Sequence, residues 1–362
     1  MTITVKASSP ADFLALVPHL VGFDPLNSVV LIAFRGTGTC GVLRLDLPSA
    51  PVVHKRLATH AVGILCKIPD VDAVGVIICT NELFGAGSAP PHVEFATTML
   101  ARLRQSGIPI RGAFCRAGDG WGSYFDPAGP VGGHSLGDIE RSEIAVGLPD
   151  TLFDLADPPD APIAARRRVA RQLSRYRDLA QGGVSHPDFA ALDDVALFVE
   201  RALEWNEHAF SESAALLLFL LQSPPSRDAT MLQWATSITL GDDLWEHRDD
   251  PGGADAGWDE TSGNLMLGIG PRPDPERVLR AISLLLRLVS VSGKRARPAI
   301  LCMLAWLNWA LGRGTIGGRH ANAALAIAPD YGMALLLKAM LDNGMQPEWA
   351  FARPIGEDIA RA

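Results

Sequence analysis

The sequence predicts an N-terminal α/β sheet domain followed by an α-helical C-terminal domain. In the first third of the chain, short apolar runs alternate with longer stretches whose apolar residues recur at helical spacing, as they do where helices cover a sheet. A stretch rich in Gly, Pro and Asp follows, and helical periodicity dominates after it. We therefore expect an α/β domain over 1–117, a linker or irregular arm over 118–162, and a helical domain over 163–362.

The first domain is expected to begin its sheet with a continuous apolar strand, Ser28–Phe34, which is too short for a helix. The segment Gly36-Thr-Gly-Thr39 permits a tight reversal into a hairpin partner, Cys40–Leu47. A helix, a strand, a helix and a strand are then predicted in this order: Val52–Lys67, Ala73–Cys79, His92–Ser106 and Ile108–Cys115. The alternation is βαβαβ-like, so we expect at least part of the sheet to be parallel.

The second domain is predicted to consist mainly of helices. They are expected at Ala164–Leu179, Asp188–His208, Glu212–Leu221, Asp228–Leu240, Pro275–Ser290 and Arg297–Leu311. Glycines and acidic residues interrupt the helical pattern over Glu246–Pro275 for longer than an ordinary connection. Residues 297–343 resemble a tetratricopeptide-like helix pair, because Gly312, Ala324 and Pro329 fit its small and helix-terminating positions. Such a pair is either a hairpin that caps the domain or a groove for a partner.

Composition indicates a folded protein and restricts its partners. Hydrophobic residues make up 48% of the 362 residues and charged residues 20%, near the averages of globular domains. The net charge of −8 argues against wholesale binding to nucleic acid or to an anionic membrane, although a local basic face could bind either. The longest apolar runs fall short of the ~20 residues of a membrane-spanning helix, and the first residues lack the apolar core of a signal peptide.

The cysteines are odd in number, widely spaced and mostly set among apolar residues: Cys40, Cys66, Cys79, Cys115 and Cys302. None of them forms the CxxC pair that is typical of zinc or redox sites. We interpret them as reduced, buried thiols of a cytoplasmic protein.

A motif near the N-terminus resembles a known family. Leu16-Val-Pro-His-Leu-Val-Gly-Phe23, followed by Pro25 and Ser28-Val-Val-Leu31, is similar to an actinobacterial family, domain of unknown function 4192. The resemblance extends over nearly the whole chain through Asp46-Leu-Pro48, Trp121, Ser123-Tyr124, Arg227-Asp228, Ala305-Trp306 and the segment from Ala324 to Tyr331. The family is uncharacterised, so the resemblance implies no activity and no catalytic residues.

Seven residues are candidates for binding a ligand: His19, Gly85, Gly87, Trp121, Tyr124, Arg227 and Asp228. His19 lies within the family motif and is either a structural histidine at a helix end or a catalytic base. The loop Gly85-Ala-Gly-Ser-Ala-Pro90 follows a central strand, where open α/β sheets bind ligands, but it matches no nucleotide-binding fingerprint. Trp121 and Tyr124 sit among glycines, so they either close the sheet edge or line a pocket.

Three further patterns suggest chemistry. Gly133-His-Ser-Leu-Gly137 matches the nucleophile elbow, but no buried strand is predicted before it, so Ser135 is interpreted as a chance match. The six arginines of Arg166–Arg177 could contact phosphates, form a solvated face, or pair with the acidic loop Asp242–Glu260. That loop lacks calcium-hand spacing, and His247 has no second histidine at metal-ligand spacing. We predict no cofactor and no metal site.

The sequence favours a cytoplasmic binding or protein-interaction module. The expected partner is another protein or a second copy of the chain, with a small-molecule ligand as a further possibility, and neither nucleic acid nor a membrane is favoured. The alternative function is a hydrolase or a nucleotide-using enzyme with a site between the two halves, lined by the Gly85 loop, Trp121 and the acidic loop. The sequence assigns no catalytic residue to either function.

Overall fold

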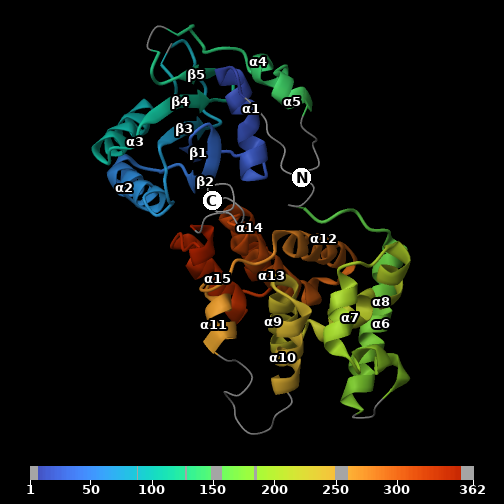
Figure 1. Ribbon diagram of the computed structural model, residues 1–362. Helices are drawn as coiled ribbons and strands as arrows, with labels where there is room; N and C mark the ends of the chain where they lie inside the picture. Colours follow the sequence, from blue (N-terminus) through green and yellow to red (C-terminus); the bar gives the residue numbers. More distant parts are fainter. Residues whose placement is uncertain are drawn as a thin grey trace. The chain divides into compact units, whose positions relative to one another are not determined.

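The computed structural model describes residues 7–87, 89–126, 129–147, 157–182, 186–248 and 260–351. The chain divides into two compact units, one formed by Met1–Phe153 with Phe351–Ala362 and the other by Asp154–Ala350. The first contains a five-stranded sheet with helices, and the second is helical (Figure 1). The predicted fold class is therefore confirmed.

The sheet has the strand order β2-β1-β3-β4-β5. β1 (Ser28–Arg35) pairs antiparallel with β2 (Gly38–Asp46) on one side and with β3 (Ala73–Cys79) on the other. β4 (Ile110–Arg116) is parallel to β3, and the short β5 (Trp121–Ser123) returns antiparallel to β4. The expected parallel pairing is thus limited to β3 and β4. β2 and β3 also run in the same direction, but β1 lies between them.

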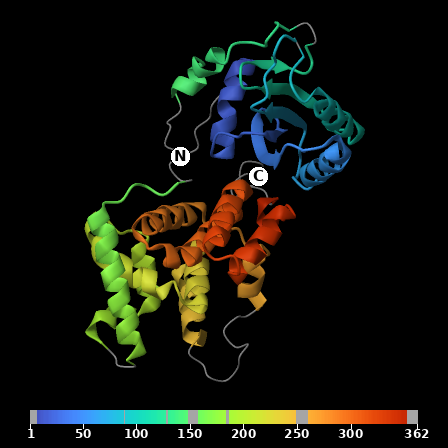
Figure 2. The same cartoon turned by 180° about the vertical axis from the view of Figure 1, so that it is seen from behind.

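Helices cover both faces of this sheet (Figures 1 and 2). α2 (His54–Leu65) and α3 (Val93–Gln105) pack on one face with the alternate strand residues that point there, such as Leu31 and Val76. α1 (Pro10–Val21), α4 (Gly137–Glu140) and α5 (Glu143–Gly147) cover the opposite face with residues such as Ile32 and Ile77. Both crossovers, β2-α2-β3 and β3-α3-β4, move across the sheet in the direction of β5. The right-handed rule for such connections therefore places α2 and α3 on one face.

α1, which carries the family motif, begins at a capping box. The Asp12 N–H donates to Ser9 Oγ at 3.1 Å, and the Ser9 N–H donates to Asp12 Oδ2 at 3.0 Å. The Ser8 hydroxyl also donates to the Asp12 carboxylate and holds its pKa below the usual range. Gly22 ends the helix in the left-handed conformation at φ 86°, which a glycine adopts without strain. The motif is therefore a helix with both of its ends specified by sequence.

The second unit consists of α6 (Ile163–Gln181), a 3₁₀ turn η3 (Pro187–Leu192), α7 (Val195–Ala202), α8 (Glu207–Leu220), α9 (Pro224–Ala235), α10 (Ile238–Arg248), α11 (Glu260–Met266), α12 (Pro275–Val291), α13 (Arg297–Ala310), α14 (Gly314–Ile327) and α15 (Gly332–Asp342). The continuous helix predicted over Asp188–His208 was wrong. Asp194 caps α7 by accepting from the Leu197 N–H at 2.8 Å, and Asn206 caps α8 by accepting from the Ala209 N–H at 2.9 Å. These two caps divide the segment.

α13 is the buried centre of this unit, with every residue from Pro298 to Ala310 inside the core. α14 crosses it closely, because a Cβ at Gly317 would lie 2.7 Å from the Ala305 carbonyl oxygen. α15 packs on α14 and also contacts α13. The three helices form the region predicted to be tetratricopeptide-like. Of the helices built from described residues, none is both long and apolar enough to cross a membrane.

An ion pair joins α7, α9 and α12. Arg277 donates to both carboxylate oxygens of Glu200, at 2.6 and 2.8 Å, and to the Gln233 carbonyl oxygen at 3.1 Å. The Gln233 side-chain amide donates to the same carboxylate at 3.1 Å. Hydrogen bonds from Arg277 hold the pKa of Glu200 below its usual range. The pair is largely shielded from water and satisfies most of its own hydrogen bonds.

The substitution R277M should destabilise the helical unit by about 2 kcal/mol at pH 7, because Glu200 loses its cation while it stays mostly buried. Since the folded-state pKa of Glu200 is lowered, its stabilisation is present above the unfolded pKa and is lost as the pH falls through the folded pKa. Urea unfolding should therefore give a difference between variant and wild type that shrinks as the pH falls through the lowered pKa of Glu200. Tryptophan fluorescence reports on this unit, because every tryptophan except Trp121 falls within it. A difference independent of pH would contradict this role for the pair.

Candidate functional site

The carboxyl ends of the parallel strands β3 and β4 lie at one edge of the sheet, the position at which open α/β sheets bind ligands. The antiparallel strand β1 begins at the same edge, because Ser28 pairs with Cys79. Polar side chains from this edge and its loops are Asp24, Asn27, Thr80, Glu82, His92 and Arg116.

One cluster at this edge joins a hydroxyl, an imidazole and a carboxylate. His92 Nε2 lies 3.0 Å from Thr80 Oγ1 and 3.5 Å from Glu82 Oε1. A nucleophile–histidine–acid triad places the nucleophile and the acid on different ring nitrogens, whereas both groups here contact Nε2. Thr80 is only 5% exposed, and its hydroxyl also accepts from the Glu82 N–H at 3.1 Å. The cluster therefore fixes the start of the β3–α3 loop and lacks the arrangement of a proton relay.

The charged groups at this edge largely neutralise one another. Arg116 pairs with Asp24 at 2.5 Å, and Arg44 pairs with Asp46 at 2.5 Å. The Asn27 side chain accepts from the backbone of the β3–α3 loop at Asn81 over 3.2 Å. These contacts tie the loops to the sheet and leave few polar groups free for a ligand.

Trp121 and Tyr124 pack into the sheet edge beside this cluster. The Trp121 indole donates to the Ser135 carbonyl oxygen at 3.1 Å and stacks on the His134 ring with centroids 4.4 Å apart. The Tyr124 hydroxyl donates to the Pro91 carbonyl oxygen at 2.6 Å, and burial raises its pKa. Of the two roles proposed from sequence, the contacts favour closing the sheet edge.

The predicted glycine loop is exposed, and a backbone hydrogen bond ties it to the loop that contains Gly132. Gly85 is exposed and left-handed at φ 64°, while the Gly87 carbonyl oxygen accepts from the Gly132 N–H at 3.0 Å. Close approach explains the glycines that follow: a Cβ at Gly120 would lie 2.5 Å from the Gly132 carbonyl oxygen, and one at Gly133 would lie 2.9 Å from that of Trp121. Ser88 lies outside the described residues. The glycines therefore serve loop packing at the edge.

The remaining sequence candidates lie elsewhere. His19 is in the last turn of α1, on the other sheet face from α2 and α3. Arg227 and Asp228 are in α9 of the helical unit, where Arg227 is 5% exposed, donates to both Asp228 oxygens at 2.7 and 3.0 Å, and contacts the Tyr331 hydroxyl at 2.7 Å. This network ties α9 to the start of α15. Five of the seven candidates thus belong to the α/β unit, and Arg227 and Asp228 belong to the helical unit.

Two further patterns receive local explanations. Ser135 Oγ accepts from the Gly137 N–H at 3.2 Å in a turn that a strand does not precede. On α6, Arg175 pairs with Asp188 at 2.8 Å, and Arg166 donates to the Ser290 carbonyl oxygen at 3.1 Å. Other arginines of α6 are exposed, namely Arg167, Arg168, Arg171 and Arg177.

The predicted acidic loop begins later than expected, because Asp242, Asp243 and Glu246 belong to α10. The structure does not describe the acidic residues between Glu246 and Glu260 or the side chain of His247.

The buried thiols are poor nucleophiles at neutral pH. Burial raises the pKa of Cys79 to about 11, and it raises those of Cys115 and Cys302 to about 12, so all three are protonated at neutral pH. Cys79 and Cys115 point to opposite faces of the sheet. In the part of the chain that the structure describes, no three His, Cys, Asp or Glu side chains gather to hold a metal ion.

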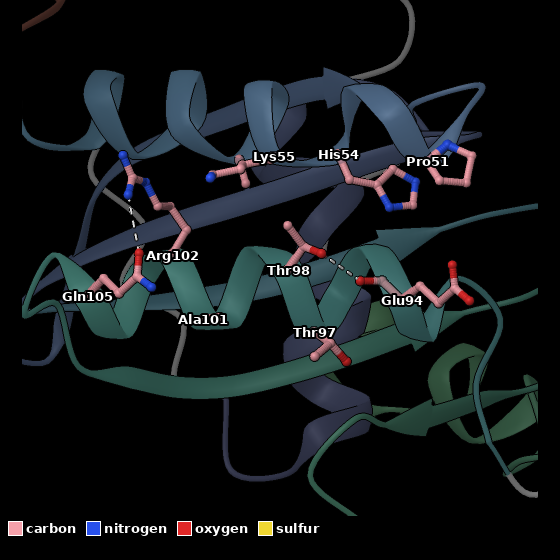
Figure 3. A pocket seen from close by; sticks show the side chains of 10 residues that line it. Pro51, His54, Lys55, Glu94, Thr97, Thr98, Ala101, Arg102 and Gln105 are labelled. Carbon is pink, nitrogen blue, oxygen red and sulfur yellow. Dashed lines mark hydrogen bonds between the residues drawn. The ribbon is translucent and has the colours of Figure 1, made fainter.

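Sequence reasoning missed a groove between α2 and α3 (Figure 3). Its volume is about 470 Å³, and we call it the α2–α3 groove. It is lined by Pro51, His54, Lys55, Ala58, Glu94, Thr97, Thr98, Ala101, Arg102 and Gln105. The side chains of Lys55 and Arg102 lie in the space between the two helices.

The helices of this groove carry an excess of cations. The basic residues on α2, on the turn after it and on α3 are Lys55, Arg56, Lys67, Arg102 and Arg104, and Glu94 is the one acid in the two helices. Among the described residues, none of these cations makes an ion pair, although Arg104 lies over the Phe125 ring at 5.9 Å. Counting charges on the two predicted helices would have revealed the excess, but only the fold shows that they are neighbours.

Most other polar groups in the groove are already bonded. The Thr97 and Thr98 hydroxyls donate to the Val93 and Glu94 carbonyl oxygens at 2.8 and 2.9 Å. One Arg102 nitrogen, Nη1, donates to Gln105 Oε1 at 3.2 Å (Figure 3). The charged donors left for a ligand are the Lys55 ammonium and the rest of the Arg102 guanidinium, and the Gln105 amide N–H groups lie beside them.

A protein-family model matches the chain, including the motif in α1. The family model described as "Domain of unknown function (DUF4192)" matches residues 10–246 and 273–348. The chain belongs to this family. The DUF4192 match takes in both units, and its first segment contains the whole sheet and both helices of the α2–α3 groove. Neither the curated proteins nor the solved structures include a match to the chain.

The close packing at the sheet edge predicts opposite outcomes for two glycine substitutions in the same unit. G120A should destabilise β4 and β5 by about 2 kcal/mol, because its Cβ would clash with the Gly132 carbonyl oxygen. G63A, at an exposed position in the last turn of α2 with no atom within 4 Å of the added Cβ, should be neutral or stabilise by about 0.5–1 kcal/mol. Hydrogen exchange of peptides from β4–β5 and α2 measures both, and unchanged exchange in G120A would show that the edge is not sealed in this way.

Proposed function

We propose that this DUF4192 protein is a binding module that takes up an anionic partner in the α2–α3 groove. The observation that supports the proposal is a set of cations without ion-pair partners among the described residues, on two helices that carry Glu94 as their one acid. Two of these cations, Lys55 and Arg102, line an open groove in a chain whose net charge is −8.

Many cations elsewhere in the chain are paired with carboxylates, in contrast to those of α2 and α3. Arginines in the helical unit repeatedly find carboxylates, as Arg280 does with Glu204 at 2.5 Å and Arg287 with Glu207 at 2.8 Å. A local cluster of uncompensated cations repels itself, and an anionic partner relieves that repulsion and is attracted during its approach. Exposed arginines of α6 also lack an ion pair among the described residues, so the proposal rests on Lys55 and Arg102 because these two line a groove.

The enzymatic alternative receives less support from the described residues. The carboxyl edge of the sheet is closed by ion pairs and backbone contacts, and the Thr80–His92–Glu82 cluster uses one imidazole nitrogen twice. The described thiols with raised pKa values are not nucleophiles at neutral pH. We accordingly favour binding over hydrolysis or nucleotide use.

We place this function in the cytoplasm and expect the partner to be a protein. The buried free thiols of Cys79, Cys115 and Cys302 fit a reducing compartment. The tetratricopeptide-like region at 297–343 would then be a second surface for protein contacts in the same molecule. An actinobacterial origin is part of the same expectation.

The double substitution K55E/R102E should weaken binding of poly-L-glutamate at least tenfold at low salt, because two attractive charges become repulsive. The matched control is K294E/R295E, which makes the same change in net charge at two exposed cations of the helical unit. Fluorescence anisotropy of labelled poly-L-glutamate with wild type and both variants gives the three affinities. Equal losses in the two variants would mean that net charge, and not the groove, governs binding.

A further inference from the structure

We infer that the occupant of the α2–α3 groove is an acidic amphipathic helix of a protein partner, seated along α3. This inference rests on the proposed function and specifies the partner's chemistry.

The shape of the groove suits a helix. It lies between two helices (Figure 3), and the small side chains Ala58 and Ala101 line it, of which Ala101 is exposed and Ala58 is buried. On α3 the lining residues run from Glu94 to Gln105, which at 1.5 Å per residue is about 17 Å, or three helical turns. Small residues between two packed helices allow a third helix to approach and complete the layer.

Apolar side chains at one end of the groove favour an amphipathic occupant over a purely charged one. Val52 is 86% exposed and follows the lining residue Pro51, while Val93 is 48% exposed and precedes the lining residue Glu94. Exposed valines next to a groove are stabilised when a partner's apolar side chains cover them. Neither valine lines the groove itself, but both lie beside it in the sequence, so a helix that extends past this end would gain from apolar side chains.

The same residues argue against a phosphate-bearing partner such as nucleic acid. The threonine hydroxyls already donate to their own helix, and Glu94 occupies the first turn of α3, where a phosphate would otherwise meet the helix N-terminus. The one aromatic ring in the lining, His54, packs edge-on against Phe95 with centroids 5.3 Å apart, so it offers no free stacking platform for bases. Carboxylates on a protein helix match the remaining donors.

The charges also specify how the occupant lies. Lys55 and Arg102 attract its acidic side chains, and Glu94 at the opposite end of the α3 lining repels them. The acidic side chains that flank the apolar face of the bound helix should therefore contact Lys55 and Arg102, and its acidic residues should be fewest next to Glu94. Specificity then comes from repulsion as well as attraction.

The test compares two labelled 18-residue peptides of identical composition, rich in leucine and glutamate. In one peptide the leucines follow the i, i+3, i+4, i+7 pattern of an amphipathic helix, and in the other the order is scrambled. Each is titrated into the full chain, with poly-L-glutamate and a 20-base-pair DNA duplex as further probes. We expect the amphipathic peptide to bind at least tenfold more tightly than the scrambled one.

Two variants separate shape from charge. A101W places a large side chain in the groove at an exposed position, and V52S removes apolar cover without changing charge. V52S should weaken the amphipathic peptide severalfold and leave poly-L-glutamate affinity unchanged. A101W, which fills the groove, should weaken the amphipathic peptide more than poly-L-glutamate, whereas K55E/R102E should weaken both. Far-UV circular dichroism of each variant checks that it is folded.

Three results would overturn the inference. Equal affinity of the two peptides, with A101W changing neither, would show that the groove reads charge alone, and the proposed function would survive if K55E/R102E still weakened both. Tighter binding of the DNA duplex, lost in K55E/R102E, would assign the groove to phosphates. If K55E/R102E altered the binding of none of the anionic probes, the proposed function would fail together with the inference.

Discussion

The architecture of the α/β unit depends on the burial of β1 and β3 on both faces. Residues Val29–Ala33 and Val76–Ile78 have no exposed surface, so helices must cover the sheet twice. Two successive crossovers of the same hand place α2 and α3 side by side on one face, and α1 with its capped ends covers the other. The α2–α3 groove follows from this arrangement, because two helices that pack side by side on a sheet leave a furrow between them on the solvent side.

Much of this fold could be predicted from sequence. The apolar runs at β1 and β3 and the helical spacing of α2 and α3 place these elements to within a few residues. Boundaries set by single side chains were missed, as where Asp194 and Asn206 start new helices inside a segment of uniform helical pattern. The antiparallel pairing of β1 with β3 was also missed, because strand order depends on contacts distant in sequence.

The site was harder to predict than the fold. Glycines and aromatic residues of the β3–α3 loop and of β5 were predicted to bind a ligand. In the structure they pack closely at the end of the sheet, where Trp121 stacks on His134. The groove residues have no motif, since Lys55 and Arg102 stand 47 positions apart and become neighbours only through the crossover geometry. A charge count over each predicted helix would have flagged α2 and α3, but it flags α6 more strongly, since α6 has six arginines and one acid. We favour α2 and α3 because a groove lies between them.

The central claim, that the α2–α3 groove receives an anionic partner, is tested most directly by hydrogen exchange of the full chain with and without saturating poly-L-glutamate. The account predicts slower exchange over residues 51–67 and 91–107, with no change over 163–181, where α6 exposes its arginines. Protection confined to α6, or bound poly-L-glutamate with no protection in α2 and α3, would contradict it.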